Sequence, residues 1–243
     1  MFKKSKQSTG IQEDRVGGSF GPWESGAYPV VIDMAYLHQS EGGAYAVNFT
    51  FKTQDAKELR QTIYVTNKKG ETFYTKEGKD YDLPGYLLVN SICLLTVGKA
   101  LEELDKTNKT LKIYSFVAKS EVPTEVPVFL DLIGETVTLG LHKVRENKNV
   151  KQNGKYVPTN EERILNEVDK VFQAETNLTV SEIVNEQEEA EFYAKWVEKN
   201  DGVLRDKYKA VSGGGSAAPM NSTPSSPSSE EGSAPKKNLF GKK

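Results

Sequence analysis

The chain has 243 residues and a net charge of −2 at pH 7, and 37% of its residues are hydrophobic. Its single cysteine, Cys93, excludes a framework of intrachain disulfides and fits a reducing cytosol. No apolar run reaches the roughly 18 residues of a membrane-spanning helix, and Met1–Lys4 precedes polar residues rather than the apolar core of a signal peptide. We therefore expect no membrane partner.

Charge is distributed unevenly along the chain. Residues 161–201 contain twelve acidic and four basic residues, a net charge of −8, so the remainder of the chain carries +6. This separation predicts a basic surface that binds an acidic partner, and an acidic segment that lies away from it. Solvated faces of ordinary elements are the alternative interpretation for either half taken alone.

Apolar side chains alternate with polar ones in the N-terminal half. This pattern predicts strands over residues 26–36, 44–53, 59–66 and 71–75. Residues 1–25 are rich in glycine and are expected to be irregular, and residues 76–84 are expected to form a polar loop. Leucine and isoleucine at helical spacing predict a helix over 86–104.

The C-terminal half predicts further strands and one helix. Strands are expected over residues 110–118, 135–145, 156–157 and 168–172. Pro123 and Pro127 are expected to flank a turn, and residues 128–133 to form a short helix. Thr179–Glu182 resembles the start of a helix, whose body is expected over 181–199.

These elements predict a mainly β fold with helices. Their order is expected of a β-barrel such as the OB-fold, although other small β-rich folds with helices fit nearly as well. The chain then divides into an irregular N-terminal arm (1–25), one OB-fold-like domain with a C-terminal helix (26–211) and a tail (212–243). Small and polar residues dominate 212–235, so the tail is expected to be disordered.

Enzyme signatures give little support to catalysis. A phosphate-binding loop ending in Lys-Ser/Thr and a His-Glu-x-x-His motif do not occur in the sequence. Cys93 stands among apolar residues and is expected to be a core thiol. His38 and His142 each end a strand and are expected to be solvated or satisfied, and the acids of 186–191 to form a solvated helix face. We expect no catalysis, no metal and no cofactor.

A first group of aromatic and basic residues surrounds the turn expected at 67–70. Strand alternation turns Tyr64 away from Ile63 and Val65, whereas Phe49 and Phe51 are expected in the core. Single-stranded nucleic acid needs cations for its phosphates and flat rings for its bases, and each stacked base contributes about 1–3 kcal/mol. The candidate DNA contacts in this group are Tyr64, Lys68, Lys69, Tyr74 and Lys76.

A second group lies in a hairpin over residues 142–155, with its tip at Asn153-Gly154. It contains five bases against the single acid Glu146, and we expect it to clasp the phosphate backbone. For any single lysine, a solvated loop position is an equally good interpretation. The candidate DNA contacts here are Lys143, Arg145, Lys148, Lys151, Lys155 and Tyr156.

Five short runs occur in a characteristic order. They are Asp33–Leu37, Tyr64–Gly70, Asn90–Lys99, Glu167–Phe172 and Lys236–Gly241. In this order the chain resembles, over most of residues 11–243, the single-stranded DNA-binding proteins of lytic podoviruses that carry a large virion RNA polymerase.

The resemblance implies an OB-fold protein that coats single-stranded DNA during phage DNA replication and recombination, in the cytoplasm of the infected bacterial host. It also implies that the tail contacts replication and recombination proteins, and host RNA polymerase in late transcription. The main alternative is a transcription-activating or adaptor protein whose tail is its chief functional element. A nuclease is a more distant alternative, because the sequence lacks an evident carboxylate–metal constellation.

The last eight residues place two apolar side chains between two lysine pairs. The candidate partner contacts are Lys236, Lys237, Leu239, Phe240, Lys242 and Lys243. The 24 residues of 212–235 would span on the order of 25–30 Å as a flexible coil. That reach would let the terminal peptide bind a partner while the domain stays on DNA.

Deletion of residues 236–243 is predicted to leave the affinity for oligo-dT within a few-fold of the intact protein but to abolish partner recruitment. Fluorescence titration with oligo-dT and pull-down of purified partner proteins measure the two effects separately. Loss of most of the DNA affinity would instead place the terminal lysines in the DNA site.

Overall fold

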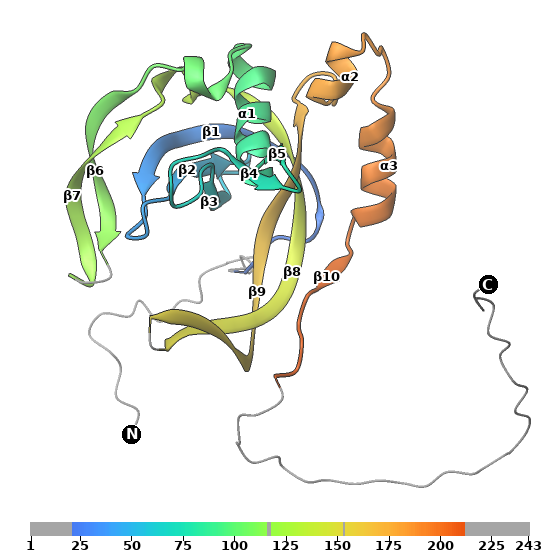
Figure 1. Cartoon of the computed structure of the whole chain (residues 1–243). Helices are drawn as coiled ribbons and strands as arrows, with labels where there is room; N and C mark the ends of the chain where they lie inside the picture. The colour runs from blue at the N-terminus through green and yellow to red at the C-terminus, as the bar shows by residue number, and fades with distance from the viewer. Residues whose placement is uncertain (1–20, 116–117, 153, 212–243) are drawn as a thin grey trace, which may run out of the picture.

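The computed structural model describes residues 21–115, 118–152 and 154–211, and this part of the chain is mainly β (Figure 1). The strands are β1 (Gly26–Gln39), β2 (Tyr45–Lys52), β3 (Glu58–Tyr64), β4 (Phe73–Lys76), β5 (Lys79–Asp82), β6 (Thr107–Ser115), β7 (Ser120–Val128), β8 (Thr136–Gln152), β9 (Lys155–Gln173) and β10 (Leu204–Asp206). The helices are α1 (Pro84–Val97), α2 (Val180–Val184) and α3 (Glu191–Asn200), with short 3₁₀ turns η1 (Leu101–Glu103) and η2 (Leu130–Leu132).

One open sheet organises the molecule. Its strand order is β10-β8-β1-β2-β3, with β9 on the other edge of β8 and the β6–β7 hairpin attached to β1 through β7. All pairings are antiparallel except that between β10 and β8. Across the described residues no ladder joins β3 to β9; instead the Gln61 side chain donates a hydrogen bond to the Asn166 carbonyl oxygen at 3.2 Å.

Strand β1 has two sets of partners. Residues 26–31 pair with β8, and residues 31–39 pair with β2. A register shift between Ile32 and Met34 marks a bulge, which bends a strand and increases its twist. The bend lets the sheet curve around a core that includes Ile32, Val47, Phe49, Phe51, Leu139 and Leu141.

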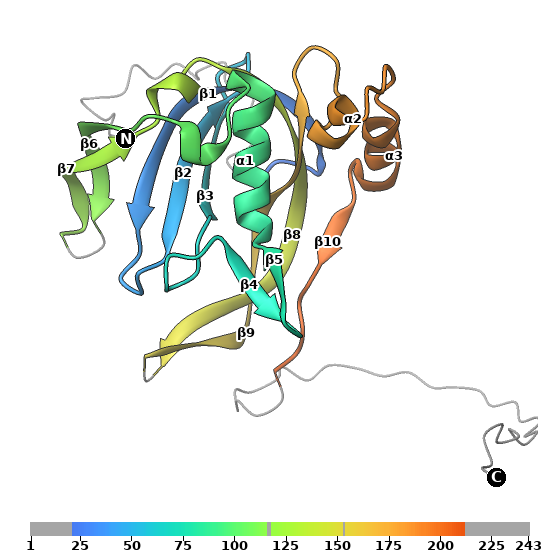
Figure 2. The ribbon, with the colours of Figure 1, turned by 45° about the horizontal axis from the view of Figure 1, so that its top comes forward.

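Helix α1 covers the inner side of this curved sheet (Figure 2). Pro84 is suited to the first turn, where its missing N–H removes no helical bond, and Gly98 ends the helix with a left-handed φ of 69°. Its buried face consists of Val89, Ile92, Cys93 and Leu95. Full burial of each such aliphatic side chain contributes about 1.5–3 kcal/mol. The core positions predicted for Cys93, Phe49 and Phe51 are therefore confirmed.

Helix α3 packs on the opposite face of β8 and β9. Trp196 lies over Gly140, where an added Cβ would stand 3.0 Å from the ring. The indole N–H donates to Asp169 Oδ2 at 2.8 Å. Phe172 meets the Trp196 ring edge-on, at 6.0 Å between centroids. A glycine in β8 thus creates the docking position of the helix.

The single helix predicted over 181–199 is wrong, because the segment forms α2 and α3 with a break between them. The Glu182 carboxylate accepts hydrogen bonds from the Thr179 N–H at 2.8 Å and from the Phe192 N–H at 2.9 Å. Burial opposes its ionisation, but these hydrogen bonds outweigh burial and lower its pKa. Glu182 therefore caps α2 and holds the start of α3.

Other boundaries also differ from the predictions. The polar loop expected over 76–84 contains the turn and second strand of the β4–β5 hairpin, and the helix expected to reach 104 ends at Val97. Pro123 and Pro127 do not flank a turn but lie within β7, opposite Lys112 and Asn108 of β6. The helix expected over 128–133 is only the 3₁₀ turn η2.

The predicted tail and most of the predicted arm lie outside the described residues. The end of the arm is attached to the domain, since the Trp23 N–H donates to Asn166 Oδ1 at 2.7 Å. In the described residues, no helix is long and apolar enough to cross a membrane.

Gly85→Ala is predicted to lower the free energy of unfolding by about 1–3 kcal/mol, because it crowds a packed site. A Cβ atom at Gly85 would overlap the Tyr64 carbonyl oxygen, where α1 begins against the end of β3. Gly42→Ala is the matched control, since its Cβ would lie 3.5 Å from Lys68 Cε, an ordinary contact. Urea denaturation measures the stability of both variants. Equal stabilities would show that the contact between the start of α1 and the Tyr64 carbonyl group tolerates a side chain.

Candidate nucleic-acid interface

The β4–β5 hairpin presents an aromatic and basic face. Tyr74 pairs with Tyr81 and Lys76 with Lys79, so strand alternation places these four side chains on one face. The two tyrosine rings stack with centroids 5.6 Å apart and an interplanar angle of 24°, and each residue is 45% exposed. Among the described residues, no acidic side chain forms an ion pair with either lysine.

The opposite face of this hairpin is acidic. It carries Asp80 and Asp82, and the Thr75 hydroxyl donates to Asp80 Oδ1 at 2.6 Å. Glu77 and Gly78 form the turn with φ values of 53° and 74°, the positive pair that a type I′ hairpin turn requires. Tyr81 was not among the predicted contacts, although alternation on both sides of Glu77-Gly78 was a signal for it.

Tyr64 lies at the end of β3 and is 50% exposed, so its predicted orientation away from the core is confirmed. It belongs to the outer face of β1, β2 and β3. In this face His38, Ala46 and Tyr64 form one cross-strand row, and Tyr36, Asn48 and Thr62 form the next. Partial burial raises the Tyr36 pKa, with Arg60 opposing the shift. Tyr36 is a ring that sequence analysis had not selected.

The loop between β3 and β4 holds Lys68 and Lys69 in the solvent. Asn67 shapes this loop, because its Oδ1 accepts from the Lys69 N–H at 2.8 Å and from the Glu71 N–H at 3.1 Å. Side-chain bonds of this kind are typical of asparagine in turns.

The two basic groups predicted from sequence meet at the turn between β1 and β2. Lys68 lies against this turn at Gly42, while Lys151 Nζ of the β8–β9 hairpin lies 3.9 Å from the Glu41 carboxylate. Figure 2 shows the ends of β1 and β2 and the β8–β9 tip toward the lower end of the view. Lys155 and Tyr156 stand at that tip, and Tyr156 is 73% exposed.

Acidic side chains balance most of the bases in the β8–β9 hairpin. Lys143 pairs with Glu24 at 2.6 Å and Lys148 with Glu161 at 2.8 Å. Arg145 pairs with both Glu162 at 2.6 Å and Asp206 at 3.2 Å. The hairpin is therefore much less positive than its own sequence indicates. Of its five basic residues, Lys155 at the tip is the one that forms no ion pair within the described residues.

Arg145 also holds the segment that follows β10. Its guanidinium lies 4.9 Å from the centre of the Tyr208 ring. Asn147 Nδ2 donates to the Lys209 carbonyl oxygen at 2.7 Å, and the Lys209 N–H donates back to Asn147 Oδ1 at 2.9 Å. Asn160 exchanges hydrogen bonds with Val211 in the same way. Residues 204–211, which we call the strap, are thereby fastened along the hairpin.

Three features typical of catalytic sites, which are a reactive thiol, a hydrolase motif and a group of metal ligands, find little support in the described residues. Burial raises the Cys93 pKa to about 12, so its thiolate is disfavoured. Gly17–Gly21 has the spacing Gly-x-Ser-x-Gly, but strand β1 rather than a helix follows it, and the hydrolase motif requires a helix. The described chain contains no group of three His, Cys, Asp or Glu side chains able to hold a metal ion.

No protein-family model matches the chain, and a search of curated proteins finds no match. The predicted partner contacts at 236–243 lie outside the described residues.

Arg145→Ala is predicted to loosen the strap more than it weakens binding of single-stranded DNA. Exposed ion pairs contribute little to stability, so the free energy of unfolding should change only slightly. Hydrogen exchange at the Lys209 and Val211 amides should accelerate. Lys155→Ala, the control, should leave this exchange unchanged and weaken oligo-dT binding. Unchanged exchange together with lost DNA affinity in Arg145→Ala would make Arg145 a DNA contact.

Proposed function

We propose that this protein binds single-stranded DNA with little regard to base sequence. The observation that carries the proposal is the face of the β4–β5 hairpin, where the stacked rings of Tyr74 and Tyr81 stand beside Lys76 and Lys79. A stacked base contributes about 1–3 kcal/mol, and every base has a flat surface that can stack. Lysines add the attraction for phosphates that binding of this kind requires.

The surrounding surface supports a longer contact. Tyr64 and Tyr36 face outward from β3 and β1, and Lys68 and Lys69 border the same end of the sheet. A DNA single strand that crosses this face would meet both aromatic rings and lysine side chains. Lys155 and Tyr156 at the β8–β9 tip extend it at one edge.

We further propose that the domain is a variant of the OB-fold. If the β4–β5 and β6–β7 hairpins are regarded as insertions, the remaining order is β1, β2, β3, α1, β8 and β9, and β8 pairs with β1. Five strands and one helix in this order fit a five-stranded Greek-key barrel. In this interpretation the gap between β3 and β9 is an opening in the barrel wall that α1 covers from within.

The biological role rests on the resemblance of the five short runs described above. It is to coat single-stranded DNA in phage replication and recombination, in the cytoplasm of the bacterial host. The tail would contact replication and recombination proteins and host RNA polymerase.

Tyr74→Ala/Tyr81→Ala is predicted to weaken oligo-dT binding by at least about 30-fold, because the loss of two stacking positions costs about 2–6 kcal/mol. Lys76→Gln/Lys79→Gln should make the slope of log affinity against log salt less negative by about 1.4, at about 0.7 per phosphate on a single strand. Quenching of tryptophan and tyrosine emission at several salt concentrations measures both effects.

Thr75→Ala is the matched control, because Thr75 lies on the opposite face of the same hairpin. It should bind oligo-dT like the wild type. If the tyrosine and lysine variants also did so, the hairpin would not be a DNA site. If the wild type failed to bind oligo-dT even at low salt, the adaptor alternative would take the place of this proposal.

A further inference from the structure

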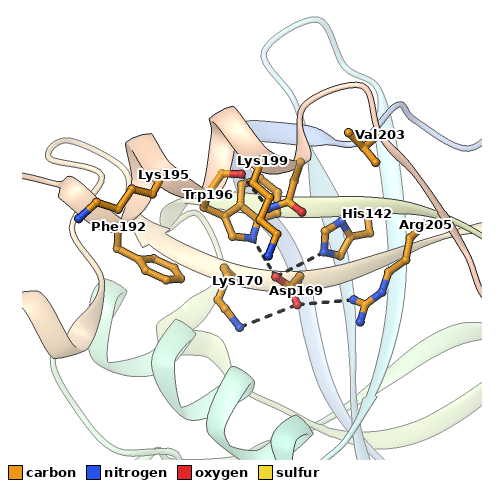
Figure 3. A pocket seen from close by; sticks show the side chains of 10 residues that line it. His142, Asp169, Lys170, Phe192, Lys195, Trp196, Lys199, Val203 and Arg205 are labelled. Atoms are coloured by element: carbon orange, nitrogen blue, oxygen red, sulfur yellow. Dashed lines mark hydrogen bonds and ion pairs between the residues drawn. The ribbon is translucent and has the colours of Figure 1, made fainter. Parts of the chain in front are cut away.

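A pocket of about 500 Å³ lies between α3, β9 and β10 (Figure 3). Four cationic side chains line it, together with two aromatic rings and one carboxylate. The cations are Lys170, Lys195, Lys199 and Arg205, the rings are Trp196 and Phe192, and the carboxylate is Asp169. Lys195 is engaged by Glu191 at 2.8 Å, but the pocket still holds more positive than negative charge. This surplus occurs within the segment that sequence analysis had expected to be acidic.

The hydrogen-bond and ion-pair partners of Asp169 explain why the surplus positive charge of the pocket remains available to a ligand. Its Oδ2 accepts the Trp196 N–H at 2.8 Å and lies 3.5 Å from His142 Nε2. Its Oδ1 lies 3.8 Å from Lys170 Nζ and 4.0 Å from an Arg205 nitrogen, beyond hydrogen-bond distance. Asp169 therefore positions α3, while Lys170 and Arg205 keep N–H donors for another anion.

The remaining groups around the pocket leave its surplus of positive charge in place. His142 is 7% exposed, and its burial lowers its pKa, so that it is neutral near pH 7. Lys199 forms no ion pair within the described residues. In the view of Figure 3, Lys170, Lys199 and Arg205 surround Asp169 from three elements of the fold. Phe192, 39% exposed, offers an apolar surface beside them.

The pocket shares two lining residues with a groove that reaches the proposed DNA interface. Asp169 and Lys170 also line a second groove of about 620 Å³, which follows the gap between β3 and β9. Tyr64 lines this groove from β3, and Ser181 lines it from α2. A DNA strand that leaves the Tyr64 ring and follows the groove would reach Lys170. Lys199 and Arg205 lie beyond Lys170, in the pocket.

We propose that the pocket binds backbone phosphates of a DNA strand that has passed Tyr64 and followed this groove. The inference rests on the proposed function and extends its site around the edge of the sheet to α3. Phosphate is favoured over a peptide carboxylate because the groove starts at an exposed stacking ring. The strand would thus have a second cationic contact, far in sequence from the β4–β5 hairpin.

Lys199→Gln/Arg205→Gln tests the proposal in the full-length chain. Affinity is measured by fluorescence titration with oligo-dT of increasing length, at 50 and 200 mM salt. The variant should bind short oligonucleotides like the wild type and lose affinity only for oligonucleotides long enough to reach the pocket. For those, loss of two phosphate contacts should make the change in affinity between the two salt concentrations about sevenfold smaller.

Lys109→Gln/Lys112→Gln is the matched control, because it removes two exposed positive charges from β6, at the other side of the sheet. Circular dichroism melts verify that both variants are folded. Equal length and salt dependence in the two variants would overturn the pocket proposal while leaving the proposed function intact. Absence of oligo-dT binding by the wild type would overturn both.

A poly-glutamate peptide serves as a competing probe. If it bound the wild type and not Lys199→Gln/Arg205→Gln, while oligo-dT binding of the two was equal at every length, the pocket would be a peptide site and the phosphate proposal would be wrong. Under the proposal, long oligo-dT displaces any bound poly-glutamate and short oligo-dT does not.

Discussion

The structure depends on the division of β1 between two partners. Its first residues pair with β8 and its later residues with β2, and the bulge between Ile32 and Met34 accommodates the change. Because both ladders share one backbone, the curvature of the sheet and the location of the β1–β2 turn are set together. That turn is where Lys68 and Lys151, from loops far apart in sequence, come near each other.

The same curvature leaves the sheet open between β3 and β9. Helix α1 closes the inner side of this gap by burying Val89, Ile92 and Leu95, and Gly85 lets it approach the backbone at Tyr64. A groove lined by α1, β3 and β9 runs along this gap and shares Asp169 and Lys170 with the pocket beside α3. Here an interruption of backbone pairing creates a surface that a complete ladder would have filled.

Charge is arranged differently from what the linear sequence implies. The acidic segment 161–201 does not lie apart from the bases, because Glu161 and Glu162 pair with Lys148 and Arg145 across the β8–β9 ladder. Conversely, α3 directs Lys195 and Lys199 into a pocket with Arg205. Exposed pairs of this kind contribute little stability. Their larger effect is to decide which cations remain available to an anionic ligand.

Strand alternation in the sequence by itself determined the first three strands, the buried rings of Phe49 and Phe51 and the outward ring of Tyr64, because a period of two assigns each side chain to a face. Tertiary structure alone decided the break between α2 and α3, where the Glu182 carboxylate reaches the Phe192 N–H. It also decided the pairing of Arg145 with Asp206 and the open edge between β3 and β9. These features depend on distances between segments that only the folded backbone brings together, so no local pattern in the sequence could specify them.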